Sequence, residues 1–153
     1  MKVRYSYLEQ QFNDCEDLWD NLRQFVKSGD FTLGKPLIEF ERKFGDLIGA
    51  KHAIGVNSGT DAIKLSLKAL GIRQGDEVIT AANTFVATVG AIAETGATPV
   101  FVDCDDTFCM NVDLLEAAIS ARTRAIVPVH FTGYMTDMLK LTPLAEKHEL
   151  RVV

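Results

Sequence analysis

The sequence has 153 residues, of which 47% are hydrophobic and 24% are charged, a composition typical of a globular domain. No apolar run approaches the roughly 18–20 residues that span a bilayer, and no secretory signal opens the chain, so we expect no membrane partner. A formal net charge of −5 disfavours nucleic acid as a partner. Three cysteines, Cys15, Cys104 and Cys109, are too few and odd in number for a disulfide framework and favour a cytoplasmic location.

Residues 1–50 are predicted to form a helical N-terminal arm. Between residues 14 and 28, apolar side chains recur at helical spacing, and the segment from Gly29 to Pro36 interrupts the pattern. A second helix is predicted from Pro36, which suits a first helical turn, to Gly49, which suits a helix end. The apolar face of this helix consists of Leu37, Phe40, Phe44, Leu47 and Ile48.

In residues 51–153, short apolar segments alternate with segments of helical pattern. Strands that are apolar on both faces, separated by helices, are typical of βαβ units with a parallel sheet covered on both sides. We therefore predict an α/β fold with a mostly parallel sheet and flanking helices. The predicted strands are 53–56, 77–80, 98–102, 125–129 and 150–153. The predicted helices are 61–70, 85–94, 112–119 and 138–148.

The end of the chain suggests an incomplete domain. Val153 lies within the apolar part of the fifth predicted strand. In open α/β sheets the functional residues lie just beyond the carboxyl ends of the strands. We therefore expect residues 51–153 to be a cofactor-binding region that is incomplete at its C-terminus, within a longer protein.

The first candidate site is the turn around Ser58, Gly59 and Thr60. A predicted strand ends there and a helix begins at once, so that Ser58 or Thr60 can cap the helix. A phosphate group can be bound at such a turn by the first backbone N–H groups of the helix and by the positive end of its dipole. The glycine has no side chain to block its approach. A plain helix cap is the alternative interpretation. The turn has neither the lysine of a P-loop nor the glycine pattern of dinucleotide folds.

The second candidate site is Phe85, at the start of the helix that follows the strand 77–80. This position lies at the same end of the sheet as the Ser58 turn. An aromatic ring there can stack against a flat ring whose phosphate is held by the turn. The alternative is a phenylalanine buried in the core.

Several sequence blocks, in order and with matching spacing, resemble one family. The chain is similar to the pyridoxal-phosphate-dependent nucleotide-sugar aminotransferases of the DegT/DnrJ/EryC1/StrS group, and the likeness covers nearly its whole length. It implies the N-terminal part of the large domain of the fold-type-I transferase fold. The blocks that carry the resemblance are 29–34, 57–62, 75–79, 83–88, 96–103 and 128–138.

The resemblance implies roles for individual residues. Ser58, Gly59 and Thr60 match positions that hold the phosphate of pyridoxal 5'-phosphate, and Phe85 matches the aromatic residue that stacks on its pyridine ring. On the substrate side, Phe31 and Gly34 match the ends of a segment that lies near the sugar nucleotide. His130 follows the fourth predicted strand and faces the same crevice, where a buried structural histidine is the alternative.

The resemblance also implies that no catalytic residue lies in this chain. The family's Schiff-base lysine and the Asp that pairs with the pyridine nitrogen would both lie beyond Val153, so we expect the 153 residues alone to be inactive. The complete protein is expected to be a homodimer that moves an amino group from glutamate or glutamine to a nucleotide-linked keto sugar. The lysines of this chain are interpreted as surface residues: Lys27, Lys35, Lys51, Lys64, Lys68, Lys140 and Lys147.

Two other functions stay open at this point. Some members of the family replace the lysine with histidine and dehydrate the sugar, and the deciding residue lies outside the chain. A free-standing α/β module that binds a phosphorylated ligand without catalysis is the second alternative. We expect no metal site, because Cys104 and Cys109 have no completing ligand and the acidic run 103–106 suits a solvated loop.

Overall fold

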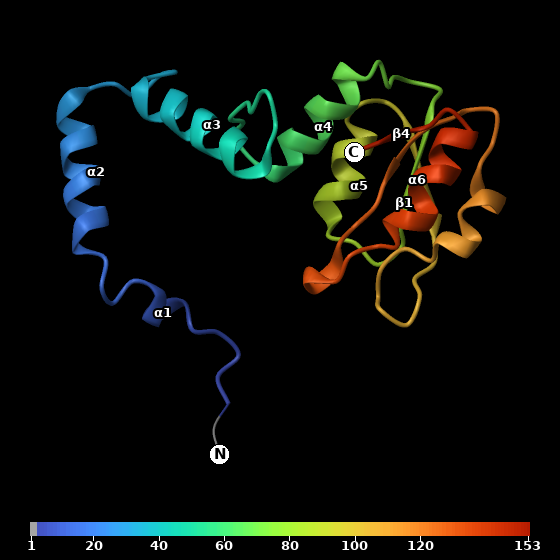
Figure 1. Ribbon diagram of the computed structural model, residues 1–153, viewed down its shortest axis with the longest axis horizontal. Helices are drawn as coiled ribbons and strands as arrows, with labels where there is room; N and C mark the ends of the chain where they lie inside the picture. The colour runs from blue at the N-terminus through green and yellow to red at the C-terminus, as the bar shows by residue number, and fades with distance from the viewer. Residues whose placement is uncertain (1–2) are drawn as a thin grey trace. The chain divides into compact units, whose positions relative to one another are not determined.

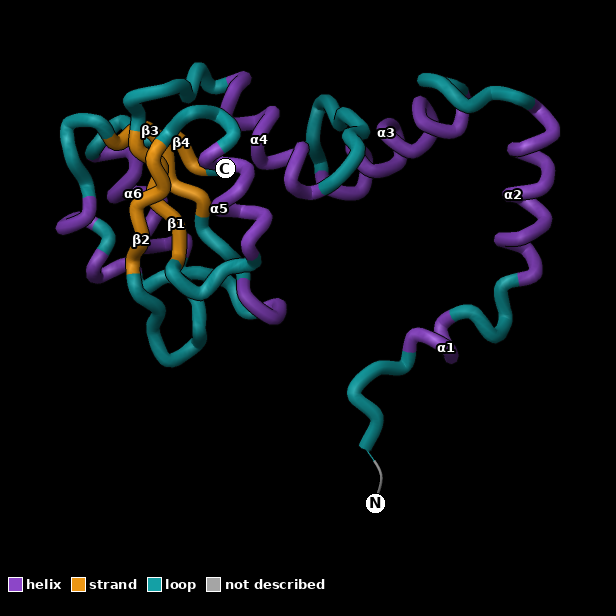
Figure 2. The backbone as a smooth tube through the Cα atoms, turned by 180° about the vertical axis from the view of Figure 1, so that it is seen from behind, coloured by secondary structure: helices purple, strands orange, loops and turns teal. Residues whose placement is uncertain are grey.

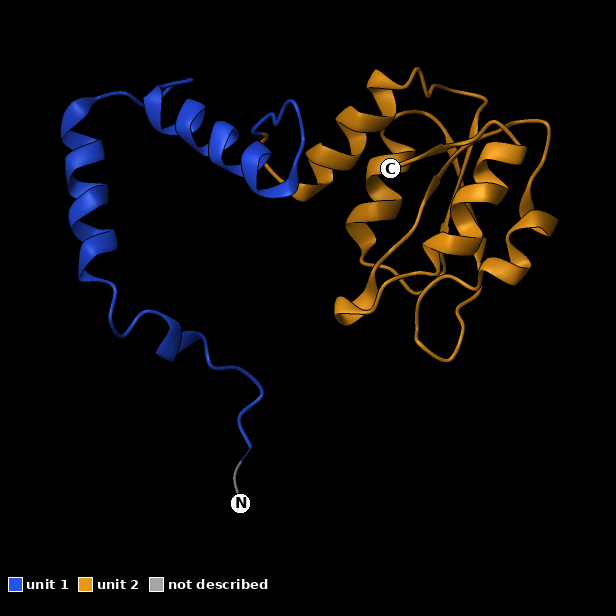
Figure 3. Ribbon diagram, viewed as in Figure 1, with its two compact units in different colours: residues 1–55 blue, residues 56–153 orange. Residues whose placement is uncertain are grey.

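The computed structural model describes residues 3–153; Met1 and Lys2 lie outside the described residues. The chain forms two compact units, which Figure 3 shows in different colours. The first unit ends at Gly55, and the second comprises Val56–Val153.

The first unit is helical, as its apolar spacing predicts. It contains α1 (Leu8–Gln11), α2 (Glu16–Ser28) and α3 (Lys35–Ile48). Gly29 and Gly49 end α2 and α3 in the left-handed conformation, which glycine adopts without strain. Within residues 3–153, every helix is too short or too polar to cross a membrane.

The second unit is built on a parallel sheet of four strands in the order β2-β1-β3-β4. The sheet appears in orange in Figure 2. β1 lies between β2 and β3, and all five of its residues are buried. This position explains the apolar residues Val78, Ile79 and Ala81, which pack on both faces of the sheet. The hydroxyl of the buried Thr80 donates to the carbonyl of Val127. The strands are β1 (Glu77–Ala81), β2 (Thr98–Val102), β3 (Thr123–Val127) and β4 (Arg151–Val152).

Helices cover both faces of this sheet (Figure 1). On one face, α4 (Gly59–Ala69) and α5 (Val86–Ala93) pack through Leu67 and Ile92 against Val78 of β1. The other face carries α6 (Met138–Lys147) and the short 3₁₀ turns η1 (Val112–Leu114) and η2 (Glu116–Ala118). A further 3₁₀ turn, η3 (Phe131–Gly133), follows β3.

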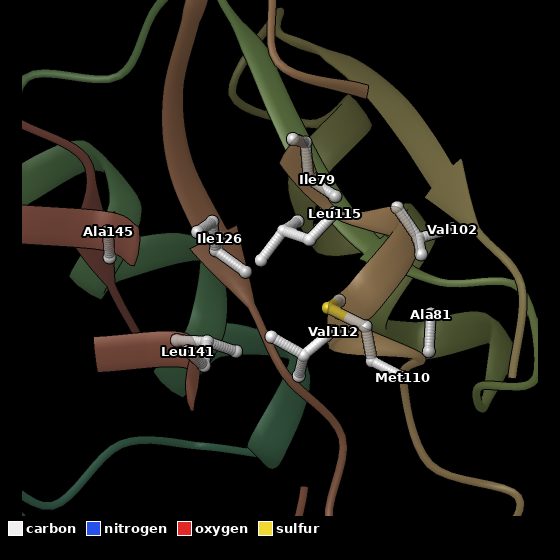
Figure 4. Packing of buried hydrophobic residues seen from close by; sticks show 9 residues of the cluster. All are labelled: Ile79, Ala81, Val102, Met110, Val112, Leu115, Ile126, Leu141 and Ala145. Atoms are coloured by element: carbon white, nitrogen blue, oxygen red, sulfur yellow. The ribbon is translucent and has the colours of Figure 1, made fainter. Parts of the chain in front are cut away.

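Figure 4 shows the larger of the two cores. Ile79 of β1 and Ile126 of β3 are fully buried there against Leu115 and Leu141. Successive residues of a strand point to opposite faces, so the neighbours Val78 and Ile79 serve different cores. The predicted parallel sheet with helices on both sides is therefore confirmed.

Two predicted elements are wrong. Residues 53–56 form no strand; they do not pair with any strand within residues 3–153, and Ile54 is 81% exposed. Residues 112–119 form η1 and η2 instead of one α-helix. Their apolar residues Val112, Leu115 and Ala118 recur every three positions, and this spacing matches the three residues per turn of a 3₁₀ helix.

Candidate functional site

The turn before α4 caps the helix with a serine. The Oγ atom of Ser58 accepts a hydrogen bond from the backbone N–H of Asp61 at 3.1 Å. The first backbone bond of the helix runs from the N–H of Ala62 to the carbonyl of Ser58, so the N–H groups of Gly59 and Thr60 precede the helical ladder. These two groups are available to an anion.

The space beside Gly59 is open. A Cβ atom added at Gly59 would meet no atom of the structure within 4 Å. A phosphate group can therefore approach the backbone here, and the positive end of the helix dipole favours it. Together, Ser58, Gly59 and Thr60 form a short segment that fits the phosphate of a cofactor, and we call it the cradle.

An ion pair lies next to the cradle. The ammonium group of Lys64 is 2.7 Å from Asp61 Oδ1 and 2.9 Å from Glu94 Oε2. The hydrogen bond from Lys64 lowers the pKa of Asp61, and the hydrogen bonds to the two carboxylates raise the pKa of Lys64. An unpaired carboxylate in the first turn of α4 would repel a phosphate, and Lys64 offsets this charge. The Asp-Lys spacing of three on a helix is the sequence signal that could have identified the pair.

Phe85 lies at the start of α5, four residues after the end of β1. Its carbonyl accepts the N–H of Thr88 at 3.0 Å, and its side chain is 75% exposed. It is therefore not a core residue of this structure. The exposed ring offers a flat apolar surface at the carboxyl edge of the sheet.

The cradle and Phe85 both lie toward the carboxyl edge of the sheet in the second unit. α5 begins directly after the carboxyl end of β1, and α4 leads through residues 70–76 into the amino end of β1. Both helices therefore run antiparallel to β1, and both begin toward the carboxyl edge of the sheet, as Figure 1 shows. This edge is where open α/β sheets bind their ligands.

His130 lies in the loop after β3, at the same edge. Its Nδ1 atom accepts a hydrogen bond from the backbone N–H of Thr136 at 3.2 Å, which assigns the proton to Nε2 in the neutral ring. The side chain is exposed, so the alternative of a buried structural histidine is wrong. Thr132, two residues later, has a positive φ of 51°.

Phe31 and Gly34 belong to the first unit, in the segment between α2 and α3. The ring of Phe31 is 61% exposed and meets the ring of Phe25 edge-on, with 5.4 Å between the ring centroids. Gly34 caps α3, and the carboxylate of Asp30 accepts the N–H of Lys35 at 2.9 Å. A Cβ atom at Gly34 would lie too close to Oδ1 of Asp30, so a larger residue there would require the Asp30 side chain to move.

One contact at the carboxyl edge was not predicted from the sequence. Asn83 donates a hydrogen bond from Nδ2 to the carbonyl of Phe108 at 3.3 Å. It joins the turn before α5 to the loop after β2, residues 25 positions apart. Within residues 3–153, His, Cys, Asp and Glu side chains form no cluster of three that could hold a metal ion.

The fold and this edge define an α/β domain in which an open helix start and an exposed aromatic ring lie toward the same edge of a parallel sheet. The profile of the DegT/DnrJ/EryC1/StrS aminotransferase family matches residues 13–153. The chain belongs to this family.

Individual relatives are similar over nearly the whole chain. A dTDP-3-amino-3,4,6-trideoxy-alpha-D-glucose transaminase from Micromonospora megalomicea subsp. nigra is 42% identical over 97% of this chain and 40% of its own length. A UDP-N-acetyl-3-dehydro-alpha-D-glucosamine 3-aminotransferase from Acidithiobacillus ferrooxidans is 44% identical over 90% of this chain and 38% of its own length. The chain therefore spans about two fifths of the length of these relatives.

The fold is similar to solved structures over nearly the whole of this chain but only part of theirs. The crystal structure of ntda from Bacillus subtilis with bound cofactor PMP superposes with a TM-score of 0.95 and 36% identity. The match covers 99% of this chain and 35% of that chain.

Proposed function

We propose that the complete protein uses pyridoxal phosphate to transfer an amino group from glutamate or glutamine to a keto sugar carried on a nucleotide. The observation that carries this proposal is the open cradle at the start of α4 together with the exposed ring of Phe85 at the same edge of the sheet. The names of the two relatives, a transaminase and an aminotransferase of nucleotide sugars, support it and favour amino transfer over dehydration.

The residues of this chain would bind and orient the cofactor. The N–H groups of Gly59 and Thr60 and the hydroxyl groups of Ser58 and Thr60 would hold its phosphate. The ring of Phe85 would cover one face of the pyridine ring and exclude water from it. When bound, pyridoxal phosphate supplies an electron sink for carbanion chemistry at the amino-bearing carbon.

Three residues are proposed to lie on the substrate side. His130 carries its proton on Nε2, so that it can donate a hydrogen bond to a substrate oxygen while its ring is neutral. The exposed ring of Phe31 offers an apolar surface, and Gly34 leaves room at the start of α3 for the Asp30 carboxylate. We propose these three positions as sugar-nucleotide contacts.

The lysine whose amine would bond covalently to the cofactor is proposed to lie outside residues 1–153. The lysines of the described chain lie on helices or near helix ends, and Lys64, which lies nearest the cradle in sequence, pairs with two carboxylates. A paired ammonium group is a poor nucleophile because its charged form is stabilised. We therefore expect the 153-residue chain alone not to complete amino transfer.

We also propose that the complete protein is a cytoplasmic homodimer. The helix α2 carries Leu18, Leu22 and Val26 at spacings of four, and each of these side chains is between 47% and 56% exposed. An amphipathic helix whose apolar side is uncovered gains stability when another surface covers it. The three free cysteines support a reducing compartment.

Cofactor titration of the complete protein tests the proposal. We expect pyridoxal phosphate to produce a visible absorption band, and glutamate or glutamine with a nucleotide-linked keto sugar to produce the amino sugar. A protein that binds no cofactor would contradict the proposal. A monomer that binds a phosphorylated ligand but stays colourless would favour the non-catalytic binding module.

A further inference from the structure

The loop after β2 forms a tight hairpin at the carboxyl edge of the sheet. Cys104 and Met110 pair as an antiparallel bridge, and the backbone N–H of Asp105 donates to the carbonyl of Cys109 at 3.0 Å. At the tip, the carboxylate of Asp105 accepts the backbone N–H of Thr107 at 2.8 Å. We call residues 104–110 the β2 hairpin. Figures 1 and 2 show it extending beyond the end of β2.

Phe108 occupies an unfavourable position in this hairpin. Its φ is 64°, in the left-handed region, where the corresponding residue of short hairpins is usually glycine. A bulky side chain there is strained. The ring is 63% exposed and belongs to neither core, so packing within residues 3–153 does not explain the choice of residue. Strain of this kind persists mainly at functional positions.

A hydrogen bond ties Phe108 to the candidate site. Its carbonyl accepts Nδ2 of Asn83, and Asn83 lies two residues before Phe85. The same turn therefore carries Phe85, the ring proposed to cover the cofactor, which we call the platform. It also holds the tip of the β2 hairpin through this hydrogen bond. This contact places the backbone of the hairpin tip next to the turn that carries Phe85.

We propose that the ring of Phe108 stacks on the base of the nucleotide carried by the substrate. This inference rests on the proposed function, in which the reacting sugar carbon lies at the cofactor beside Phe85. The base is joined to that sugar through a diphosphate and must lie farther out, where the hairpin tip extends. Because the hairpin carries the acidic residues Asp105 and Asp106, we assign it to the uncharged base and not to the diphosphate.

Equilibrium binding to the complete, cofactor-loaded protein tests this assignment. The probes are UDP, dTDP and GDP, with inorganic pyrophosphate as the matched ligand that lacks a base. We expect Phe108→Gly to weaken binding of the preferred nucleotide about tenfold, since the stacking of one base on an aromatic ring is of this size. Pyrophosphate binding should not change, and Phe108→Tyr should retain the affinity for the nucleotide.

The control variant is Glu149→Gly. Glu149 also has a positive φ, of 55°, but lies before β4 at the amino edge of the sheet. Both glycine variants relieve strain and should raise the melting temperature, but only Phe108→Gly should lose nucleotide affinity.

Three outcomes would overturn the assignment: nucleotide affinity within about twofold of wild type in Phe108→Gly, an equal loss of pyrophosphate binding, or a loss that accompanies dissociation of the oligomer in sedimentation. The visible absorption band of the wild-type protein is recorded in the same samples. Its absence refutes the proposed function, whereas a normal band with unchanged nucleotide affinity refutes only the stacking.

Discussion

Lys64 and Glu94 join the two helices that begin at the carboxyl edge of the sheet. The Nζ atom of Lys64, in α4, lies 2.9 Å from Oε2 of Glu94, the residue that caps the end of α5. The same ammonium group holds Asp61 in the first turn of α4. The side chain of Lys64 thus connects α4, which begins at the cradle, to α5, which begins at Phe85. It also neutralises the carboxylate of Asp61, the acidic group nearest the cradle in sequence.

Replacing this cation should weaken cofactor binding. In Lys64→Met the carboxylate of Asp61 loses its partner and repels the phosphate, so we expect a higher dissociation constant for pyridoxal phosphate and a slightly lower melting temperature. A fluorescence titration of the complete protein measures this dissociation constant. The matched control is Lys68→Met, one turn later on the same helix, which forms no ion pair with the residues that the structure describes. Equal affinity in the two variants would contradict the prediction.

The Asp61–Lys64 pair also predicts a pH dependence. Because Lys64 lowers the pKa of Asp61, the folded state favours the ionised carboxylate. This contribution is fully present above about pH 4, the ordinary pKa of an aspartate in an unfolded chain, and is lost as the pH falls through the lower folded pKa. The difference in melting temperature between wild type and Lys64→Met should therefore shrink below about pH 4. A constant difference down to acid pH would argue against this coupling.

The cap at Ser58 should contribute to stability and to cofactor binding. Ser58→Ala removes the acceptor for the N–H of Asp61, and the loss of such a cap costs about 1 kcal/mol of unfolding free energy. We expect Ser58→Thr to recover most of the stability in urea denaturation, because threonine also caps helices. If Ser58→Ala unfolds at the wild-type urea concentration, the cap has no energetic role.

Phe85 should affect binding without affecting stability. Its side chain is 75% exposed, so we expect Phe85→Ala to change the free energy of unfolding by less than about 0.5 kcal/mol. The loss of the aromatic surface should nevertheless weaken pyridoxal phosphate binding, measured by equilibrium dialysis. Phe85→Tyr keeps the ring and serves as the control. A marked destabilisation by Phe85→Ala would instead indicate a packing role in the complete protein.

The elements with clear periodicity could be predicted from sequence. The strand 98–102 matches β2 at both ends, since Pro99 and the apolar residues after it are bounded by Gly96 and the acidic turn. The segment 53–56 is as apolar as a strand but pairs with no strand within residues 3–153. Apolar character predicts burial, whereas a strand also requires a neighbour for its backbone hydrogen bonds.

The candidate site was predictable only in part. Ser58 and Gly59 have residue types with a local meaning, a cap and an unobstructed backbone, and the structure places both at the start of α4. The link between Asn83 and Phe108 depends on the approach of two loops 25 residues apart, and their residue types carry no signal for it. Long-range contacts of this kind require the fold.

The thiol of Cys109 gives the β2 hairpin a chemical reporter. Its side chain is 1% exposed, and its Sγ lies 3.2 Å from the carbonyl oxygen of Tyr134, whereas Cys15 and Cys104 are partly accessible. Alkylating reagents should therefore modify Cys109 last, at a rate limited by opening of the hairpin. Mass spectrometry of its labelling with and without nucleotide would show whether an occupied edge slows that opening.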